Sequence, residues 1–207
     1  MSERVGGSVP TATLTGTALL LALGVALPLV FHAVPMGGRI FLPMHLPTFV
    51  AGLVLGPAAG LVVGAGSPML SSLLTGMPVA PFYMVPMVFE LATYGLVSGL
   101  LRRRFDALLG GGSHLASGAS ASNASASEPV GAGRRYAAVV LALLGGMVAG
   151  RLVWMAVIVW LAPLLIPTIA RTATVAAAAI AAGWVGMAIQ LVLIPAIVRA
   201  IERVRGT

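Results

Sequence analysis

Two charged side chains stand inside the apolar part of the chain, Glu90 in PMVFELATYG (86–95) and Arg151 in AGRLVW (149–154). A charge near the middle of a bilayer costs about 2.5–3.5 kcal/mol on insertion scales, so such a residue faces a partner or a polar site. Arginine binds carboxylate or phosphate groups, and a carboxylate accepts hydrogen bonds from hydroxyl and amide groups. These two residues therefore predict a polar site within apolar surroundings.

Helical geometry places the candidate residues at similar depths. At the helical rise, Glu90 and Arg151 lie roughly 18 and 24 Å from the arginines that bound their helices. Trp184 lies about 22 Å from the arginines of the last helix by the same rise. Trp154 follows Arg151 by three residues and shares its helix face. We expect the two tryptophans to form walls of the site.

Two interpretations of Glu90 and Arg151 remain open. They can form an ion pair that only fixes helix packing, because buried charges usually pair. They can also line an outward-facing pocket in which Arg151 meets an acidic ligand group. His45, in the proline-broken stretch RIFLPMHLPTF (39–49), either touches a ligand or packs in the protein. One histidine is no metal site, and we expect neither a metal nor a cofactor.

The composition of the chain indicates a membrane protein surrounded by lipid. The 207 residues are 59% hydrophobic and 8% charged, with a mean hydropathy of +1.05, whereas a soluble domain carries roughly a quarter charged residues. The sequence has no cysteine, which excludes thiol catalysis and iron–sulfur ligation. It has no lysine, which excludes a P-loop. The pI of 11.5 reflects arginines beside a membrane rather than nucleic-acid binding.

Apolar runs predict an all-α fold, a six-helix transmembrane bundle forming a single membrane domain over 1–207. A spanning helix needs about 20 apolar residues, and the run from Ile40 to Leu101 fits three, divided near Gly64–Gly66 and at GMPVAP (76–81). The Gly-, Ala- and Ser-rich residues 105–133 predict a flexible cytoplasmic linker. The helices are expected at about 14–31, 42–63, 66–77, 82–101, 136–161 and 174–198.

Arginine distribution orients this bundle with both termini in the cytoplasm. Arg39 and Arg171 then lie outside and Arg151 lies within the fifth span. The remaining nine arginines lie inside, as the positive-inside rule requires. These are Arg4, Arg102, Arg103, Arg104, Arg134, Arg135, Arg199, Arg203 and Arg205.

Small residues recur at four-residue spacing in three helices. Such stripes allow close approach of helix backbones in lipid, and we interpret the glycine stripes as packing within the bundle. For the alanine stripe, packing within the bundle and a docking face for a partner both remain open. The glycines are Gly52, Gly56, Gly60 and Gly64, with Gly146 and Gly150, and the alanines are Ala18, Ala22 and Ala26.

Three stretches in this order, FLPMHLPTFVAGLVLGPAAGLVVG, SPMLSSLLTGMP and FELATYGLVSGLL, resemble the substrate-binding S components of energy-coupling factor (ECF) vitamin transporters. The similarity covers 14–104 well and 136–200 by pattern. It implies the substrate-specificity subunit of an ECF-type ABC importer, which captures a vitamin or vitamin-like solute from outside and does no chemistry on it. The implied partners are a transmembrane coupling subunit and two ATPase subunits, in a bacterial or archaeal plasma membrane.

The resemblance also implies roles for particular residues. Family members carry alanines on the first helix that contact the coupling subunit, and these match Ala18, Ala22 and Ala26. The family's ligand site lies near the outer face, beneath the loop after the first helix. By position this implicates the 36–47 loop with Arg39 and His45, and Glu90, Arg151 and Trp184. Arg151 favours an acidic vitamin such as pantothenate.

Other classes of protein fit less of the sequence. An intramembrane enzyme would need paired carboxylates or a Ser–His or Ser–Lys arrangement, and none is evident. A self-sufficient membrane facilitator or small channel of unknown solute is the main alternative, and a purely structural membrane partner is another. Transport by the chain without ATPases would favour the facilitator.

Topology provides the first test. In this cysteine-free chain, single cysteines replacing Gly37 and Pro163 should react with an impermeant thiol reagent from outside. A cysteine replacing Ser120 should react only after permeabilisation. External labelling at position 120 would show that the orientation is the reverse of the predicted one. The site would then lie near the other face of the membrane.

Overall fold

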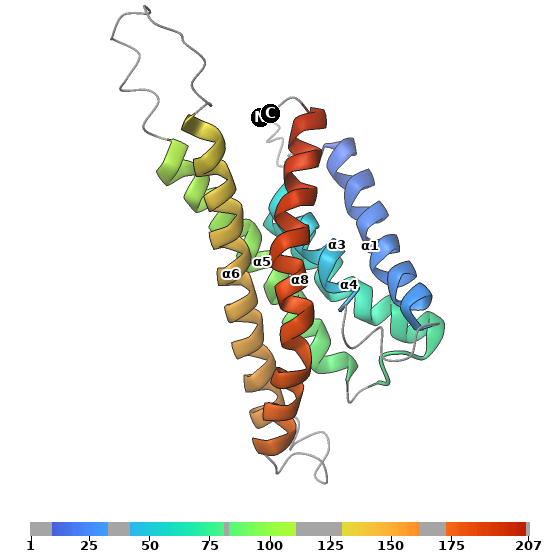
Figure 1. Cartoon of the computed structure of the whole chain (residues 1–207). Coiled ribbons are helices and arrows are strands. Elements are labelled where there is room, and N and C mark those ends of the chain that lie inside the picture. Colours follow the sequence, from blue (N-terminus) through green and yellow to red (C-terminus); the bar gives the residue numbers. More distant parts are fainter. Residues whose placement is uncertain (1–9, 33–41, 81–82, 111–129, 162–172, 206–207) are drawn as a thin grey trace, which may run out of the picture.

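In the computed structural model, the described residues form a bundle of α-helices (Figure 1), which confirms the all-α prediction. The structure describes residues 10–32, 42–80, 83–110, 130–161 and 173–205. No strand occurs within these ranges. The elements are α1 (Thr11–His32), α3 (His45–Val50) with a π-helical continuation η1 (Ala51–Leu55), α4 (Pro57–Thr75), α5 (Met84–Gly110), α6 (Val130–Ala156) with a π-helical continuation η2 (Val157–Leu161), and α8 (Ala173–Arg205).

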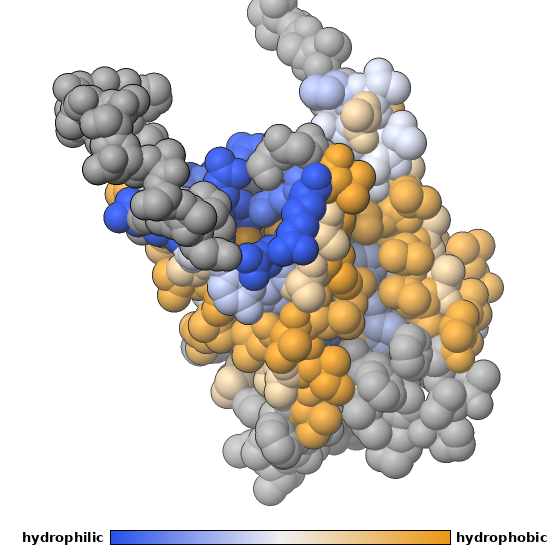
Figure 2. Space-filling view, turned by 45° about the horizontal axis from the view of Figure 1, so that its top comes forward, coloured by the Kyte–Doolittle hydropathy of each residue, from blue (hydrophilic) through white to orange (hydrophobic). Residues whose placement is uncertain are grey.

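Within the described ranges, five helices are long and apolar enough to cross a membrane, and the chain is a multi-pass membrane protein. Large apolar side chains such as Leu73 and Trp160 point outward from these helices. Figure 2 shows this apolar surface along the sides of the bundle, with the hydrophilic residues gathered at one end. The segment His45–Leu55 is also apolar but too short to span. The predicted span 42–63 is therefore wrong in its length.

The boundary between the second and third helices lies at Gly56, whereas the sequence prediction placed it near Gly64–Gly66. Gly56 has φ 107°, a conformation that favours glycine, and its N–H donates to the carbonyl of Ala51 at 3.1 Å. Pro57 then begins α4, where a missing N–H costs no helical hydrogen bond. The predicted helices 42–63 and 66–77 are therefore replaced by His45–Leu55 and Pro57–Thr75.

Glycines bring α4 into backbone contact with α5. A side chain at Gly60 or Gly95 would overlap the backbone of the other residue, and one at Gly64 would overlap the backbone of Leu91. Gly52 likewise lies against the carbonyl of Gly95. These contacts confirm packing within the bundle for three glycines of the predicted stripe, because in lipid small residues let helices approach closely. Gly56, the fourth, forms the break instead.

The start of α1 and the end of α8 lie at the same end of the bundle (Figure 1). The end of α5 and the start of α6 lie there too. The side of the membrane that this end faces stays a prediction. Because α5 continues to Gly110 and α6 begins at Val130, the ends of the predicted 105–133 linker are helical. Residues 111–129 lie outside the described residues.

Substitution at the α4–α5 contact tests the packing. Gly95→Ala should lower the unfolding temperature, since overpacking costs about 1–3 kcal/mol and each kcal/mol shifts Tm by about 2–4 °C at this size. Gly133→Ala is the matched control, because a Cβ there meets no atom within 4 Å and alanine favours the helix by up to about 1 kcal/mol. Equal unfolding temperatures for the two variants would contradict the close contact.

Candidate functional site

The candidate site is built on one turn of α5. Glu90 and Tyr94 lie four residues apart, and this spacing places them on the same helix face. Glu90 is 3% exposed and Tyr94 is 1% exposed, so both face the interior of the bundle. The Tyr94 hydroxyl donates a hydrogen bond of 2.7 Å to Oε1 of Glu90.

Arg151 of α6 completes the contact with Glu90. Its Nη1 lies 3.0 Å from the same carboxylate oxygen, Oε1. The helix can approach because Gly150, the preceding residue, lies directly against the Tyr94 ring, where a side chain would overlap it. The structure thus brings together the two charges that the sequence placed in apolar surroundings. A carboxylate with two charge-assisted partners forms a firm link between α5 and α6.

His45 of α3 packs against Tyr94. The two ring centroids are 5.2 Å apart, and the Phe49 ring lies 4.9 Å from the Tyr94 centroid. His45 is 2% exposed, and neither ring nitrogen has a hydrogen-bond partner among the described residues. The proline-broken segment therefore places its histidine next to the ion pair.

A non-helical turn before α3 holds this histidine in position. Leu42 has φ 47°, and its carbonyl accepts hydrogen bonds from the His45 backbone N–H at 3.0 Å and from Gln190 Nε2 at 3.3 Å. Irregular backbone at membrane depth is tolerated where protein surrounds it. Gln190, on α8, is itself buried. The fourth helix of the site therefore contacts the turn through the Gln190 amide.

Several buried polar atoms around this cluster lack a hydrogen-bond partner within the described part of the chain. They are both His45 ring nitrogens, Arg151 Nε and Gln190 Oε1. An unsatisfied buried polar group costs about 1–3 kcal/mol, so these atoms are available to a small molecule that offers both donors and acceptors. Among the described residues, no group of three or more metal-ligating side chains occurs.

The remaining predicted site residues divide into two groups. Trp154 lies on α6 one turn beyond Arg151 and is partly buried. Trp184 belongs to α8, but its side chain is not among those described, and Arg39 lies outside the described residues. Their contact with a ligand stays a prediction. Tyr94 and Gln190 were not among the predicted site residues, although the four-residue spacing from Glu90 to Tyr94 was a usable signal.

The alanine stripe of α1 faces outward. All three of its alanines are exposed, while the opposite face of α1 packs on the bundle through Gly16 against Leu55 and Gly24 against Ser67. Packing within the bundle is therefore the wrong interpretation for this stripe. Its role as a docking face stays a prediction. The three alanines are Ala18, Ala22 and Ala26.

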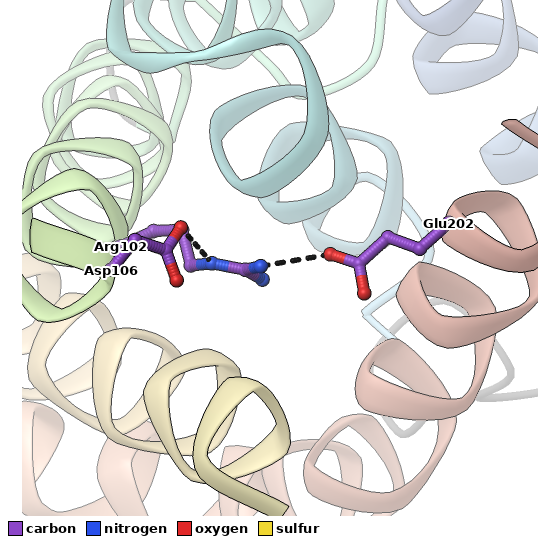
Figure 3. A network of polar contacts seen from close by, with 3 residues as sticks. All are labelled: Arg102, Asp106 and Glu202. Carbon is purple, nitrogen blue, oxygen red and sulfur yellow. Dashed lines mark hydrogen bonds and ion pairs between the residues drawn. The ribbon is translucent and has the colours of Figure 1, made fainter. Parts of the chain in front are cut away.

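A second charge cluster, around the buried Arg102, joins α5 to α8 (Figure 3). Arg102 Nε lies 2.6 Å from Asp106 Oδ2, and its Nη2 lies 2.8 Å from Glu202 Oε1. Nearby, the Arg199 guanidinium stacks over the Tyr136 ring of α6 at 5.1 Å from the centroid. The sequence interpretation treated these arginines only as topology signals. The structure shows that two of them also connect helices.

Comparison with known proteins adds one positive finding. A family model described as "ECF transporter, substrate-specific component" matches residues 12–201. The match includes all the helices from α1 to most of α8, and with them every described residue of the candidate site. No curated protein and no solved structure matches the chain.

Proposed function

Because the chain belongs to the family of substrate-specific components of ECF transporters, we propose that it captures a vitamin-like solute from outside the cell for an ATP-driven import complex. The family match over 12–201 is the observation that carries this proposal. The chain is a transport subunit, and in this family it associates with a coupling and ATPase module. Lacking lysine, it has no P-loop with which to bind ATP itself.

The proposed complex contains one transmembrane coupling subunit and two ATPase subunits in a bacterial or archaeal plasma membrane. The proposed solute site is the cluster of Glu90, Tyr94, Arg151 and His45, with Gln190 at its edge. Four helices meet there, and unpartnered donors and acceptors lie beside an ion pair. These groups suit recognition of a small polar molecule rather than catalysis, which would need a nucleophile with an adjacent base.

The ion pair bears on which solute binds. Arg151 favours an acid such as pantothenate, but its charge is already balanced by Glu90 at 3.0 Å. Because an excess buried charge is costly, a ligand carboxylate could take the place of Glu90 at the guanidinium only if Glu90 took up a proton. The hydroxyl and amide groups of pantothenate would suit His45 and Gln190. A neutral analogue with the same groups, panthenol, would leave the ion pair intact.

Removing both charges together separates a ligand role from a structural role. Arg151→Ala alone should lower stability by about 3–5 kcal/mol, because it leaves a buried carboxylate unpaired. The double variant Glu90→Gln/Arg151→Met removes both charges and keeps similar volumes, so its unfolding temperature should stay near that of the wild type. Its binding of radiolabelled pantothenate should fall at least about tenfold, the equivalent of one lost charged contact.

The single variant Glu90→Gln is the matched control, since its amide oxygen can still accept from Tyr94. It should fold, and because Arg151 then has no competing carboxylate, it should bind pantothenate no more weakly than the wild type does. Unchanged pantothenate binding by the folded double variant would show that the pair is structural. If the wild type bound panthenol but not pantothenate, the solute would not be an acid. The proposed position of the binding site would still stand.

The alanine stripe is proposed as the docking face for the coupling subunit. In lipid, close backbone contact between small residues drives helix association. Ala22→Trp should therefore leave solute binding by the isolated chain intact and abolish ATP-driven uptake in liposomes that contain the partner subunits. Leu73→Trp, on an exposed face of α4, is the control and should retain uptake.

Full uptake by the Ala22→Trp complex would reject the docking face. Accumulation of solute by the chain alone would instead favour the facilitator. The two outcomes test different parts of the proposal, because the first concerns only the interface and the second concerns the source of energy.

A further inference from the structure

The described exposed charges gather at one end of the bundle, where α5 and α8 end and α6 begins (Figures 1 and 2). We call this the arginine end. The side chains described there include seven arginines against two acids, Asp106 and Glu202. The arginines are Arg102, Arg103, Arg104, Arg134, Arg135, Arg199 and Arg203.

Both described acids at this end are already engaged. Asp106 and Glu202 each contact Arg102, which is itself buried. No ion pair within the described ranges involves the two exposed arginines at the start of α6 or the two near the end of α8. This part of the surface therefore has a marked excess of positive charge.

These four arginines lie at the same end of two neighbouring helices, α6 and α8. Arg199 and Arg203 are one helical turn apart, and that spacing places them on the same face of α8. Arg199 stacks on Tyr136 of α6 at 5.1 Å, and Tyr136 directly follows Arg134 and Arg135 in sequence. The cation–π contact thus brings the start of α6 to the level of the two α8 arginines.

The depth of this cluster is set by its apolar neighbours. Val204 is 90% exposed and adjoins Arg203, while Tyr136 is 40% exposed and adjoins Arg135. Leu141 and Leu144, further along α6, are exposed as well. A bilayer that covers these side chains places its headgroups at the level of the arginines. Tyrosine and arginine are the residues that anchor helices at this interface.

We propose that the cluster formed by Arg134, Arg135, Arg199 and Arg203 binds the phosphate of an anionic phospholipid. Guanidinium groups hold phosphate oxygens through paired hydrogen bonds, and basic sites between helices at a membrane surface recognise acidic headgroups. The acyl chains would lie along the exposed apolar surface of α6 and α8. This lipid site is independent of the solute site and of transport.

Thermal unfolding of the whole purified chain in lipid nanodiscs tests the proposal. In an equimolar mixture of phosphatidylglycerol and phosphatidylcholine, the unfolding midpoint should be about 4 °C higher than in phosphatidylcholine alone. The difference should shrink as sodium chloride is added, because exposed charges are screened. Inorganic phosphate added to phosphatidylcholine discs should not reproduce it, since free phosphate lacks the acyl chains.

Variants locate the effect. Arg134→Gln/Arg135→Gln/Arg203→Gln, which leaves the Arg199 stack in place, should lose most of the difference between the two lipids. The corresponding triple lysine variant should keep part of it, and Arg104→Gln, outside the cluster, should keep all of it. Comparing the two lipids within each variant cancels any general loss of stability. Equal midpoints in both lipids for the wild type, or an undiminished difference in the triple glutamine variant, would overturn the proposal.

Discussion

The Glu90 carboxylate has to be satisfied in the interior of the bundle, where it is 3% exposed, and much of the arrangement of α3, α5 and α6 follows from that requirement. One carboxylate oxygen, Oε1, takes both the Tyr94 hydroxyl at 2.7 Å and the Arg151 guanidinium at 3.0 Å. Tyr94 in turn supports His45 and Phe49 through ring contacts. The helices are thus tied together around one anion, and loss of one member of its ion pair would be far more costly than replacement of the whole pair by neutral groups.

Close packing by glycine makes this geometry possible. The ion pair needs α6 near α5, and Gly150 lies against Tyr94 where any side chain would collide. On the opposite side, Gly60 and Gly95 let the α4 and α5 backbones touch. Hydrophobic burial gives little drive between helices in lipid, so packing and polar contacts have to supply it. The glycines and the buried charges therefore act together to define the bundle.

The long helices and the buried charges could be predicted from sequence, because a membrane requires long apolar helices and makes lone charges within them conspicuous. Apolar length revealed the long helices, and two lone charges in apolar runs made an ion pair of Glu90 with Arg151 one of the two interpretations left open. The break at Gly56 was missed, although a glycine followed by proline is a recognisable end and start of helices. Gly64 looked similar in sequence, and only its contact with Leu91 of α5 shows that it serves packing.

Other features depend on tertiary contacts that no local pattern encodes. His45 reaches Tyr94 because the backbone turns at Leu42, and Gln190, 148 residues further along, supports that turn. Arg102 reads as one of three consecutive arginines, yet it alone is buried between Asp106 and Glu202. Where such a contact joins residues on two different helices, the positions of those helices depend on the packing of the whole bundle.

The Arg102–Glu202 contact has a consequence for biosynthesis. Its partners are 100 residues apart in sequence, and Glu202 lies near the end of the last helix. During synthesis α5 is made about 100 residues before Glu202, so this partner is not available to Arg102 while α5 enters the membrane, whereas its neighbour Asp106 is. The link between α5 and α8 can form only when the final turns of α8 have left the ribosome. This contact between α5 and α8 therefore forms after α5 has been inserted rather than during its insertion.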